Sequence, residues 1–285
     1  MKKNEAFKFF NSDYSIDRYT ELYKKVRLDK RYPANVKRLE IFINLLKKHK
    51  PKKIVDAGCG AGIPMISIKK KGFNIIGYDK APGMVKEAKN NLIKYKMKDT
   101  LVFKDDFENP RLIKDKSVDC ILGMGAFFYA KDFKKTIRNQ VKKLKKNGRL
   151  IFSLRNQLFD VATLNYYTIN FLNQIYEVKK LKKNWKKRYN KLFGGFAQKK
   201  DYKTKNIDDE GVYSLTHNPL TIGNELIKIG LKCEGLYFYH FHSLPPVFES
   251  LDQIYFRKIS WRMENPNDWR GFLLASGFVV DCKKI

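Results

Sequence analysis

Residues 54–62 read Ile-Val-Asp-Ala-Gly-Cys-Gly-Ala-Gly, a short apolar run with an acidic residue, followed by glycine at every second position. A dinucleotide-binding loop requires G-x-G-x-x-G, whose third glycine lets a helix pack on the strand while the pyrophosphate meets the helix N-terminus. Counted from Gly58, the third glycine would be residue 63, which is Ile63. Asp56 also precedes the glycines, where its charge would repel a pyrophosphate. The loop therefore favours a nucleoside cofactor with a cationic end.

A second strand pattern supports a nucleoside-binding unit. Residues 74–79 form another apolar run that ends in a carboxylate, and Asp79 lies 21 residues after Gly58. An acidic residue about 20 positions downstream of the first glycine is expected to accept hydrogen bonds from the ribose hydroxyls in such βαβ units. The glycines alone are also compatible with an ordinary tight turn from a strand into a helix. Asp79 makes the nucleoside site the favoured interpretation.

These two segments resemble the first motifs of the class I S-adenosylmethionine-dependent methyltransferases. Residues 101–107, 117–126 and 147–153 continue the resemblance in the family's order, although each run alone is also typical of an ordinary buried parallel strand. The resemblance implies S-adenosylmethionine as the cofactor and a Rossmann-like α/β fold with a seven-stranded, mostly parallel sheet, helices on both faces and an antiparallel last strand. It implies twelve cofactor-binding residues: Asp56, Gly58, Cys59, Gly60, Gly62, Asp79, Lys80, Met84, Asp106, Phe107, Gly123 and Met124.

The chain divides into four segments by its patterns. Residues 1–50 read as helices that could form a lid over the cofactor, with tyrosines at positions 14, 19 and 23 as its candidate contacts or as ordinary core residues. Residues 51–155 alternate strand and helix patterns, which predicts a parallel sheet with helices on both faces. Residues 156–214 break this rhythm and predict an inserted aromatic and basic cap, because they are too long for a simple connection. Residues 215–285 resume the alternation and complete the core.

The cap contains one clear amphipathic pattern. Leu181, Trp185, Tyr189 and Leu192 recur at helical spacing, while lysines fall mostly on the other side. We favour a helix that packs on the body of the protein and exposes a solvated lysine face. The alternative is a basic wall for an anionic substrate or a membrane surface.

Composition sets the broader expectations. Lysine and arginine number 59 against 29 acidic residues, a formal net charge of +30, but lysine is spread over the whole chain, which favours a solvated surface over a nucleic-acid site. The sequence shows no apolar run long enough to span a membrane and no secretory signal pattern, so we expect a soluble cytoplasmic protein. The four cysteines, at positions 59, 120, 233 and 282, lack metal-binding spacing and are expected to be reduced thiols.

Histidines in the C-terminal half are the candidates for proton transfer. His240 and His242 should lie on one face of a strand, because side chains alternate along it, and His217 is the third candidate. No further ligand with a recognisable spacing is present nearby, so we expect no metal site. Methyl transfer to a hydroxyl needs removal of a proton, for which a neutral histidine is suited. Tyr129 is the candidate for positioning the acceptor.

The acceptor side of the sequence is less specific. Residues 153–156, 216–220 and 239–246 resemble methyltransferases of bacterial glycan and sugar pathways. The resulting hypothesis is methyl transfer to a hydroxyl or amine of a small molecule, with a sugar or sugar nucleotide, and hence an anionic acceptor, as the suggested class. Cap-type RNA methylation and a non-catalytic nucleotide-binding protein remain alternatives. DNA amino-methylation is disfavoured, because residues 123–126 read Gly-Met-Gly-Ala where those enzymes carry a Pro-Pro-aromatic motif.

Overall fold

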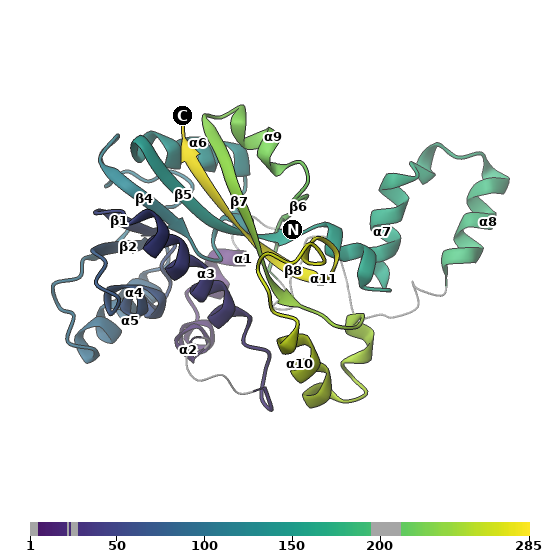
Figure 1. Ribbon diagram of the computed structural model, residues 1–285, viewed down its shortest axis with the longest axis horizontal. Coiled ribbons are helices and arrows are strands. Elements are labelled where there is room, and N and C mark those ends of the chain that lie inside the picture. Colours follow the sequence, from purple (N-terminus) through teal and green to yellow (C-terminus); the bar gives the residue numbers. More distant parts are fainter. Residues whose placement is uncertain (1–4, 22, 24–27, 195–211) are drawn as a thin grey trace.

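The computed structural model describes residues 5–21, 23, 28–194 and 212–285. It consists of one mixed sheet between helices, with a helical arm that projects to one side (Figure 1). The strands are β1 (Ile54–Ala57), β2 (Ile75–Asp79), β3 (Val102–Lys104), β4 (Val118–Gly123), β5 (Leu144–Asn156), β6 (Thr216–His217), β7 (Leu231–Phe241) and β8 (Ala275–Lys284).

The helices flank the sheet or extend from it. They are α1 (Glu5–Phe10), α2 (Asp13–Glu21), α3 (Ala34–His49), α4 (Ile63–Lys69), α5 (Pro82–Lys94), α6 (Phe133–Lys143), α7 (Tyr166–Ile175), α8 (Lys183–Phe193), α9 (Ile222–Ile227), α10 (Gln253–Arg262) and α11 (Gly271–Leu274). Short 3-10 turns are η1 (Phe127–Tyr129), η2 (Leu158–Ala162), η3 (Val178–Lys180) and η5 (Pro246–Phe248).

The strand order confirms the predicted fold class. The sheet runs β3-β2-β1-β4-β5-β8-β7, with β1 to β5 parallel and β8 antiparallel to both of its neighbours. Within the described residues the sheet has eight strands, not the seven we expected. The extra strand is β6, in which Thr216 and His217 pair in parallel with Arg155 and Asn156 at the end of β5.

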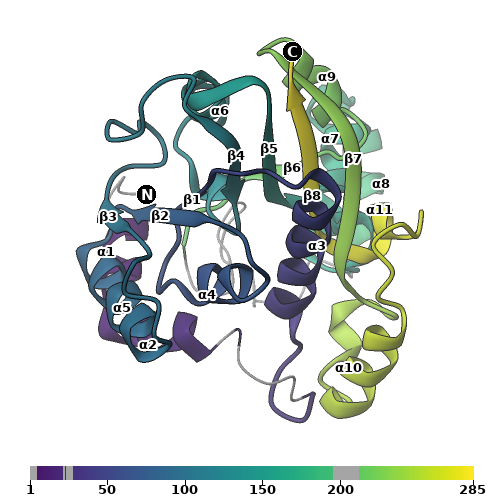
Figure 2. The ribbon, with the colours of Figure 1, turned by 60° about the vertical axis from the view of Figure 1, so that its left-hand side comes forward.

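Helices cover both faces of the sheet, which explains why the central strands are apolar on both sides. On one face, α3, α4 and α5 contribute Phe42, Met65 and Val85 to a buried cluster. On the other face, Ile137 of α6 and Leu226 of α9 join a second cluster. Figure 2 shows α3 in front of the sheet near β7 and β8. Because β1 connects to β2 on one side and β4 lies on its other side, the loops that follow these strands open a crevice at their carboxyl ends.

The cap does not pack as we expected. The predicted helix forms as α8, but none of its residues is buried, and with α7 it extends away from the sheet (Figure 1). The interpretation of α8 as a helix packed on the body is therefore wrong. The final part of the predicted cap, residues 195–211, lies outside the described residues.

Two further features concern the molecule's surface and its thiols. Within the described ranges, no helix combines the length and the apolar character needed to cross a bilayer. The cysteines at positions 59, 120 and 282 are buried, Cys233 is half-buried, and all four are free thiols.

Candidate functional site

A cavity of about 970 Å³ lies at the carboxyl edge of the parallel strands. Its lining comes from the loops that follow β1, β2, β4 and β5, from η2 and the start of α7, and from the facing ends of β7 and β8. Helices α1, α2 and α3 add further lining residues, among them Phe10, Tyr19 and Arg38. Its volume is near the upper end of small-molecule sites, which leaves room for a cofactor and an acceptor together.

The loop after β1 comes close to the loop after β4. Gly58 has a φ of +81°, and a Cβ atom added there would lie 2.7 Å from the Cβ of Ala126. Its backbone N–H donates to the carbonyl of Tyr78 at the end of β2, at 2.9 Å. A residue with a side chain would therefore be strained in its backbone and would collide with Ala126. The glycine keeps the floor of the cavity open.

Asp79 connects the two halves of the nucleoside-binding unit. Its carboxylate accepts hydrogen bonds from the backbone N–H groups of Gly60 and Ala81, each at 2.9 Å, and it lines the cavity. Burial raises the pKa of this carboxyl, while the backbone hydrogen bonds lower it. A carboxylate offers about four acceptor positions, so capacity remains to accept from a ribose hydroxyl. The structure thus fits the role that the sequence predicts for Asp79.

Asp56 and Arg38 place a carboxyl group and a guanidinium group in the lining of the same cavity. Asp56 is 1% exposed, and neither carboxylate oxygen has a hydrogen-bond partner among the described residues. Burial, and then the charge of Asp79, raise the pKa of Asp56 to about 8, while Arg38 opposes this shift. The buried Arg38 guanidinium donates to the Tyr23 hydroxyl at 2.8 Å and to the Asn35 side-chain oxygen at 2.6 Å. This pair fits the ammonium and carboxylate of a methionine-like end of a cofactor.

We predict that S-adenosylmethionine binding depends on pH through Asp56. Because the pKa is raised, Asp56 is protonated in the free protein below about pH 8 and must lose its proton to pair with an ammonium. Affinity should therefore rise between pH 6 and 7.5, by up to about tenfold per unit. Calorimetry in two buffers of different ionisation enthalpy would detect the released proton.

The Asp56→Asn variant should bind weakly and without this pH dependence. Asp99→Asn, at an exposed carboxylate paired with Lys69 far along the chain from the loop, is the matched control. A wild-type affinity that stays level over the same pH range would exclude Asp56 as the ammonium partner.

Nine of the twelve predicted cofactor residues line the cavity, whereas Gly62, Asp106 and Gly123 do not. Gly62 precedes α4 and leaves room for Ala88 of α5, whose Cβ lies 3.0 Å from the position an added Cβ would take. The Asp106 carboxylate pairs with the Lys80 ammonium at 2.6 Å, so it holds a lining residue. Gly123 lies under the Phe127 ring. The nine lining residues are Asp56, Gly58, Cys59, Gly60, Asp79, Lys80, Met84, Phe107 and Met124.

Of the four candidate residues for proton transfer and acceptor positioning, some line the cavity and others do not. His240 and Tyr129 line the cavity, and His217 and His242 do not. The His217 ring packs on Phe133 with ring centres 4.2 Å apart, and burial lowers its pKa to about 4. The His242 ring lies 4.6 Å from the His240 ring, as strand alternation predicts, but it packs on Phe159, and burial lowers its pKa to about 4.

Two side chains hold the His240 ring in place. Its Nδ1 makes a 2.7 Å hydrogen bond with the Ser276 hydroxyl, and its ring stacks on Tyr32 at 4.8 Å. The Tyr32 hydroxyl in turn donates to the Glu264 carboxylate, which also accepts the Phe241 N–H at 3.0 Å. With Nδ1 bonded to Ser276, Nε2 is the ring nitrogen available to a ligand. The φ of His240 is +62°, a conformation uncommon outside glycine that often marks a functional residue.

Three lining arginines, Arg18, Arg38 and Arg155, were not predicted as site residues. Arg38 sits among Leu39 and Phe42 on the buried face of α3, and a cation inside an apolar helical stripe is the sequence signal that could have revealed it. Arg155 lies near the end of β5, and its guanidinium stands 5.1 Å from the centre of the Phe128 ring. Only the fold brings it to the cavity.

Comparisons with known proteins agree with this geometry. Residues 55–152 match the family model described as "Methyltransferase domain". The chain is 28% identical over 165 residues to a ubiquinone biosynthesis O-methyltransferase of Coxiella burnetii, which covers 56% of this chain and 64% of that protein. It is 28% identical over 123 residues to a glycine/sarcosine N-methyltransferase of Parasynechococcus marenigrum, which covers 41% and 43%.

Solved structures share the fold over the full length. The magnesium protoporphyrin IX methyltransferase of Synechocystis, crystallised with bound S-adenosylhomocysteine, superposes with a TM-score of 0.60 at 13% identity and covers 100% of both chains. The chain spans less than two thirds of the length of the curated relatives named above. Residues 55–152 thus match a methyltransferase domain, and the chain shares its fold with a solved methyltransferase.

Proposed function

We propose that this protein transfers the methyl group of S-adenosylmethionine to a hydroxyl or amine of a small molecule. The proposal rests on one cavity that Asp56, Asp79 and His240 line together. Asp56 is buried there without a hydrogen-bond partner among the described residues, and Asp79 is the candidate for the ribose. The first two residues suit a cofactor with a cationic amino-acid end and a ribose. The third suits the removal of a proton from an acceptor.

Each residue near the cofactor has a distinct task. When bound, S-adenosylmethionine supplies an electrophilic methyl group on a sulfonium. Asp56 and Arg38 would hold the charged ends of its methionine part, Asp79 the ribose hydroxyls, and Phe107 a face of the adenine. These contacts fix the direction of the methyl group, and alignment of this kind is the main contribution an enzyme makes to a direct displacement.

The acceptor would lie between His240 and Arg155. A neutral imidazole accepts the proton of a hydroxyl as the new bond forms, and burial keeps this imidazole neutral by lowering its pKa well below the ordinary value. Charges of both signs line this side, since Arg155 and Lys131 are accompanied by Asp160 and Glu249. The lining therefore suits a polar small molecule without selecting an anion. The relatives named above do not confirm the resemblance to sugar-pathway enzymes, so a sugar acceptor is not part of this proposal.

The N-terminal helices would exclude water from the reaction, as the predicted lid requires. Phe10 of α1 packs on Tyr129 with ring centres 5.1 Å apart, and Tyr19 of α2 packs on Phe10 at 5.6 Å. All three residues line the cavity. A dry site strengthens the interactions of the charged groups inside it.

Two measurements test the proposal in sequence. Calorimetry should show S-adenosylmethionine binding to the purified protein, and the Asp79→Ala variant, which loses the ribose contacts, should show little. Incubation of cell metabolites with cofactor carrying a labelled methyl group should then label a small molecule. Failure to bind at millimolar cofactor would refute the function, and labelling of RNA in place of metabolites would move the acceptor to a different class.

A further inference from the structure

The arm formed by α7, η3 and α8, residues 165–193, is the least integrated part of the described structure. Its base reaches the cavity, which Asn165 and Tyr167 line, while its far half stands clear of the sheet (Figure 1). No residue of α8 is buried, and within α7 only Thr168 is. Most of the stability of a helix in a protein comes from packing of its apolar face. Because α8 buries no such face on its own protein, we expect a partner to cover it.

The far half of the arm, residues 178–193, carries charge of one sign, and Glu177 just before it pairs with Lys180. Residues 178–193 contain seven lysines and one arginine and no acidic residue. All six cations from Lys182 to Lys191 are exposed, and within the described ranges none of them makes an ion pair. The following residues, 195–211, contain four lysines and four acidic residues, so by sequence they carry no net charge that could neutralise the arm. The partner should therefore be anionic.

An exposed apolar strip runs beside these cations. Trp185 and Leu192 share one side of α8 and are 68% and 75% exposed, and Leu181, just before the helix, is 37% exposed. Ile175 and Tyr176, at the end of α7, are 59% and 56% exposed. Large apolar side chains that are exposed and close together mark an interaction surface.

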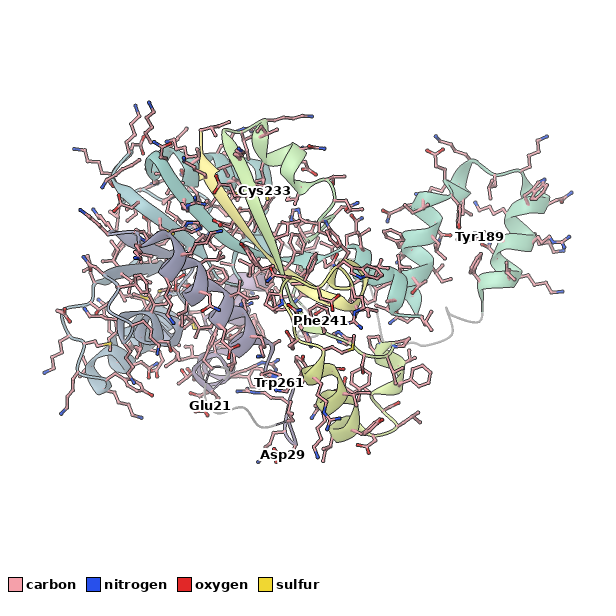
Figure 3. All side chains as sticks on the ribbon, viewed as in Figure 1. Glu21, Asp29, Tyr189, Cys233, Phe241 and Trp261 are labelled. Carbon is pink, nitrogen blue, oxygen red and sulfur yellow. The ribbon has the colours of Figure 1, made fainter. Side chains whose placement is uncertain are left out.

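The remaining aromatic residues of α8 keep the two helices of the arm together. The Tyr189 ring, labelled in Figure 3, lies 6.3 Å from the Tyr176 ring and 4.7 Å from the Phe193 ring. Tyr189 follows Trp185 by four residues and precedes Leu192 by three, so it lies on the same side of α8, where it is the least exposed of the three. At about 100° per residue, Lys182 and Arg188 flank the apolar strip, and Lys183 and Lys187 lie behind it.

We infer that this arm binds the surface of a bilayer that contains anionic lipids. The apolar strip would enter the boundary between head groups and acyl chains, and the flanking cations would reach the lipid phosphates with their long side chains. Basic amphipathic helices with tryptophan and leucine on the apolar face have this binding mode. An RNA partner would use the cations but leave Trp185 and Leu192 in water, so the strip favours the bilayer. The inference concerns the arm and is independent of the proposed methyl transfer.

Vesicle co-sedimentation tests the inference with the full-length protein. We expect binding to phosphatidylcholine vesicles that contain phosphatidylserine, weaker binding to phosphatidylcholine alone, and release by added salt. Tryptophan emission should shift to shorter wavelength on binding, and the shift should be lost in Trp185→Phe, since Trp185 is the residue that enters the lipid.

Two pairs of variants separate the strip from the charge. Replacing Trp185 and Leu192 with serine should reduce the partition coefficient at least about tenfold, whereas the same change at Trp269 and Leu251, an equally exposed pair elsewhere, should leave it unchanged. Replacing Lys182, Lys186 and Arg188 with glutamine should also reduce it at least about tenfold. The same change at Lys86, Lys89 and Lys94, exposed cations of α5, should have little effect.

Three results would overturn the inference. The first is that the protein does not bind anionic vesicles at low salt. The second is that the arm variants and their matched controls lose vesicle binding equally. The third is that the protein binds an RNA oligonucleotide but does not bind vesicles. Cofactor calorimetry on the same variants keeps the two proposals distinguishable, because the arm variants should bind S-adenosylmethionine like the wild type. A fold defect would appear there as a loss of cofactor binding.

Discussion

Gly58→Ala should weaken S-adenosylmethionine binding about 100-fold, because a misplacement of about 1 Å near a reacting group has effects of this size. The added Cβ would stand 2.7 Å from the Cβ of Ala126, and both atoms are fixed to the backbone, so one of the two loops must move. Movement of the loop after β1 displaces the backbone next to Asp56 and Asp79. Titration calorimetry gives the affinity, and thermal unfolding gives the accompanying loss of stability.

Gly72→Ala is the matched control for this change. Gly72 has a φ of +86°, close to that of Gly58, but an added Cβ would meet no atom within 4 Å. Gly72→Ala should therefore lose about 1–2 kcal/mol of stability from the left-handed backbone and no cofactor affinity. The double variant Gly58→Ala/Ala126→Gly removes the collision and should recover most of the affinity. Equal affinities for Gly58→Ala and Gly72→Ala would show that the contact with Ala126 is unimportant.

The core of the fold was predictable because its signals are local. A buried parallel strand is a short apolar run, and the acidic residues Asp56 and Asp79 sit within or at the end of such runs. Strand β6 has no such signal, since two residues cannot show a period, and its pairing depends on where β5 ends. The exposure of α8 was also unpredictable, because an amphipathic pattern says which residues share a face and not what covers that face.

The two halves of the cavity differ in how far apart in the sequence their residues lie. The cofactor half is centred on one continuous βαβ unit, so the spacing from Gly58 to Asp79 predicts its position, although Arg38 reaches it from α3. The acceptor half is assembled from distant segments: Tyr32, His240, Glu264 and Ser276 meet only in the folded chain. Strand alternation correctly put His240 beside His242. It could not show that only His240 lines the cavity, because the positive φ at His240 breaks the regular strand geometry at that point.

His240→Gln should lower kcat about 100-fold or more with the acceptor identified by the labelling screen, because removal of a positioned base has effects of this size. S-adenosylmethionine affinity should not change, since no cofactor role is assigned to His240. Burial, and then the charges of His242 and Arg155, lower the pKa of this imidazole well below its ordinary value. A base acts in its neutral form, so the wild-type kcat at saturating cofactor should stay level from pH 8 to pH 6 and fall only when the pH drops through the lowered pKa.

His242→Gln is the control that makes this result specific. Its ring lies 4.6 Å from that of His240 and is buried, but it does not line the cavity. The variant should lose stability and keep its kcat, whereas Ser276→Ala, which removes the Nδ1 partner of His240, should lower kcat without changing the cofactor affinity. If His240→Gln and His242→Gln reduce kcat equally, the effect is structural. If neither reduces it, the acceptor reacts without a protein base, as an amine that is already deprotonated would.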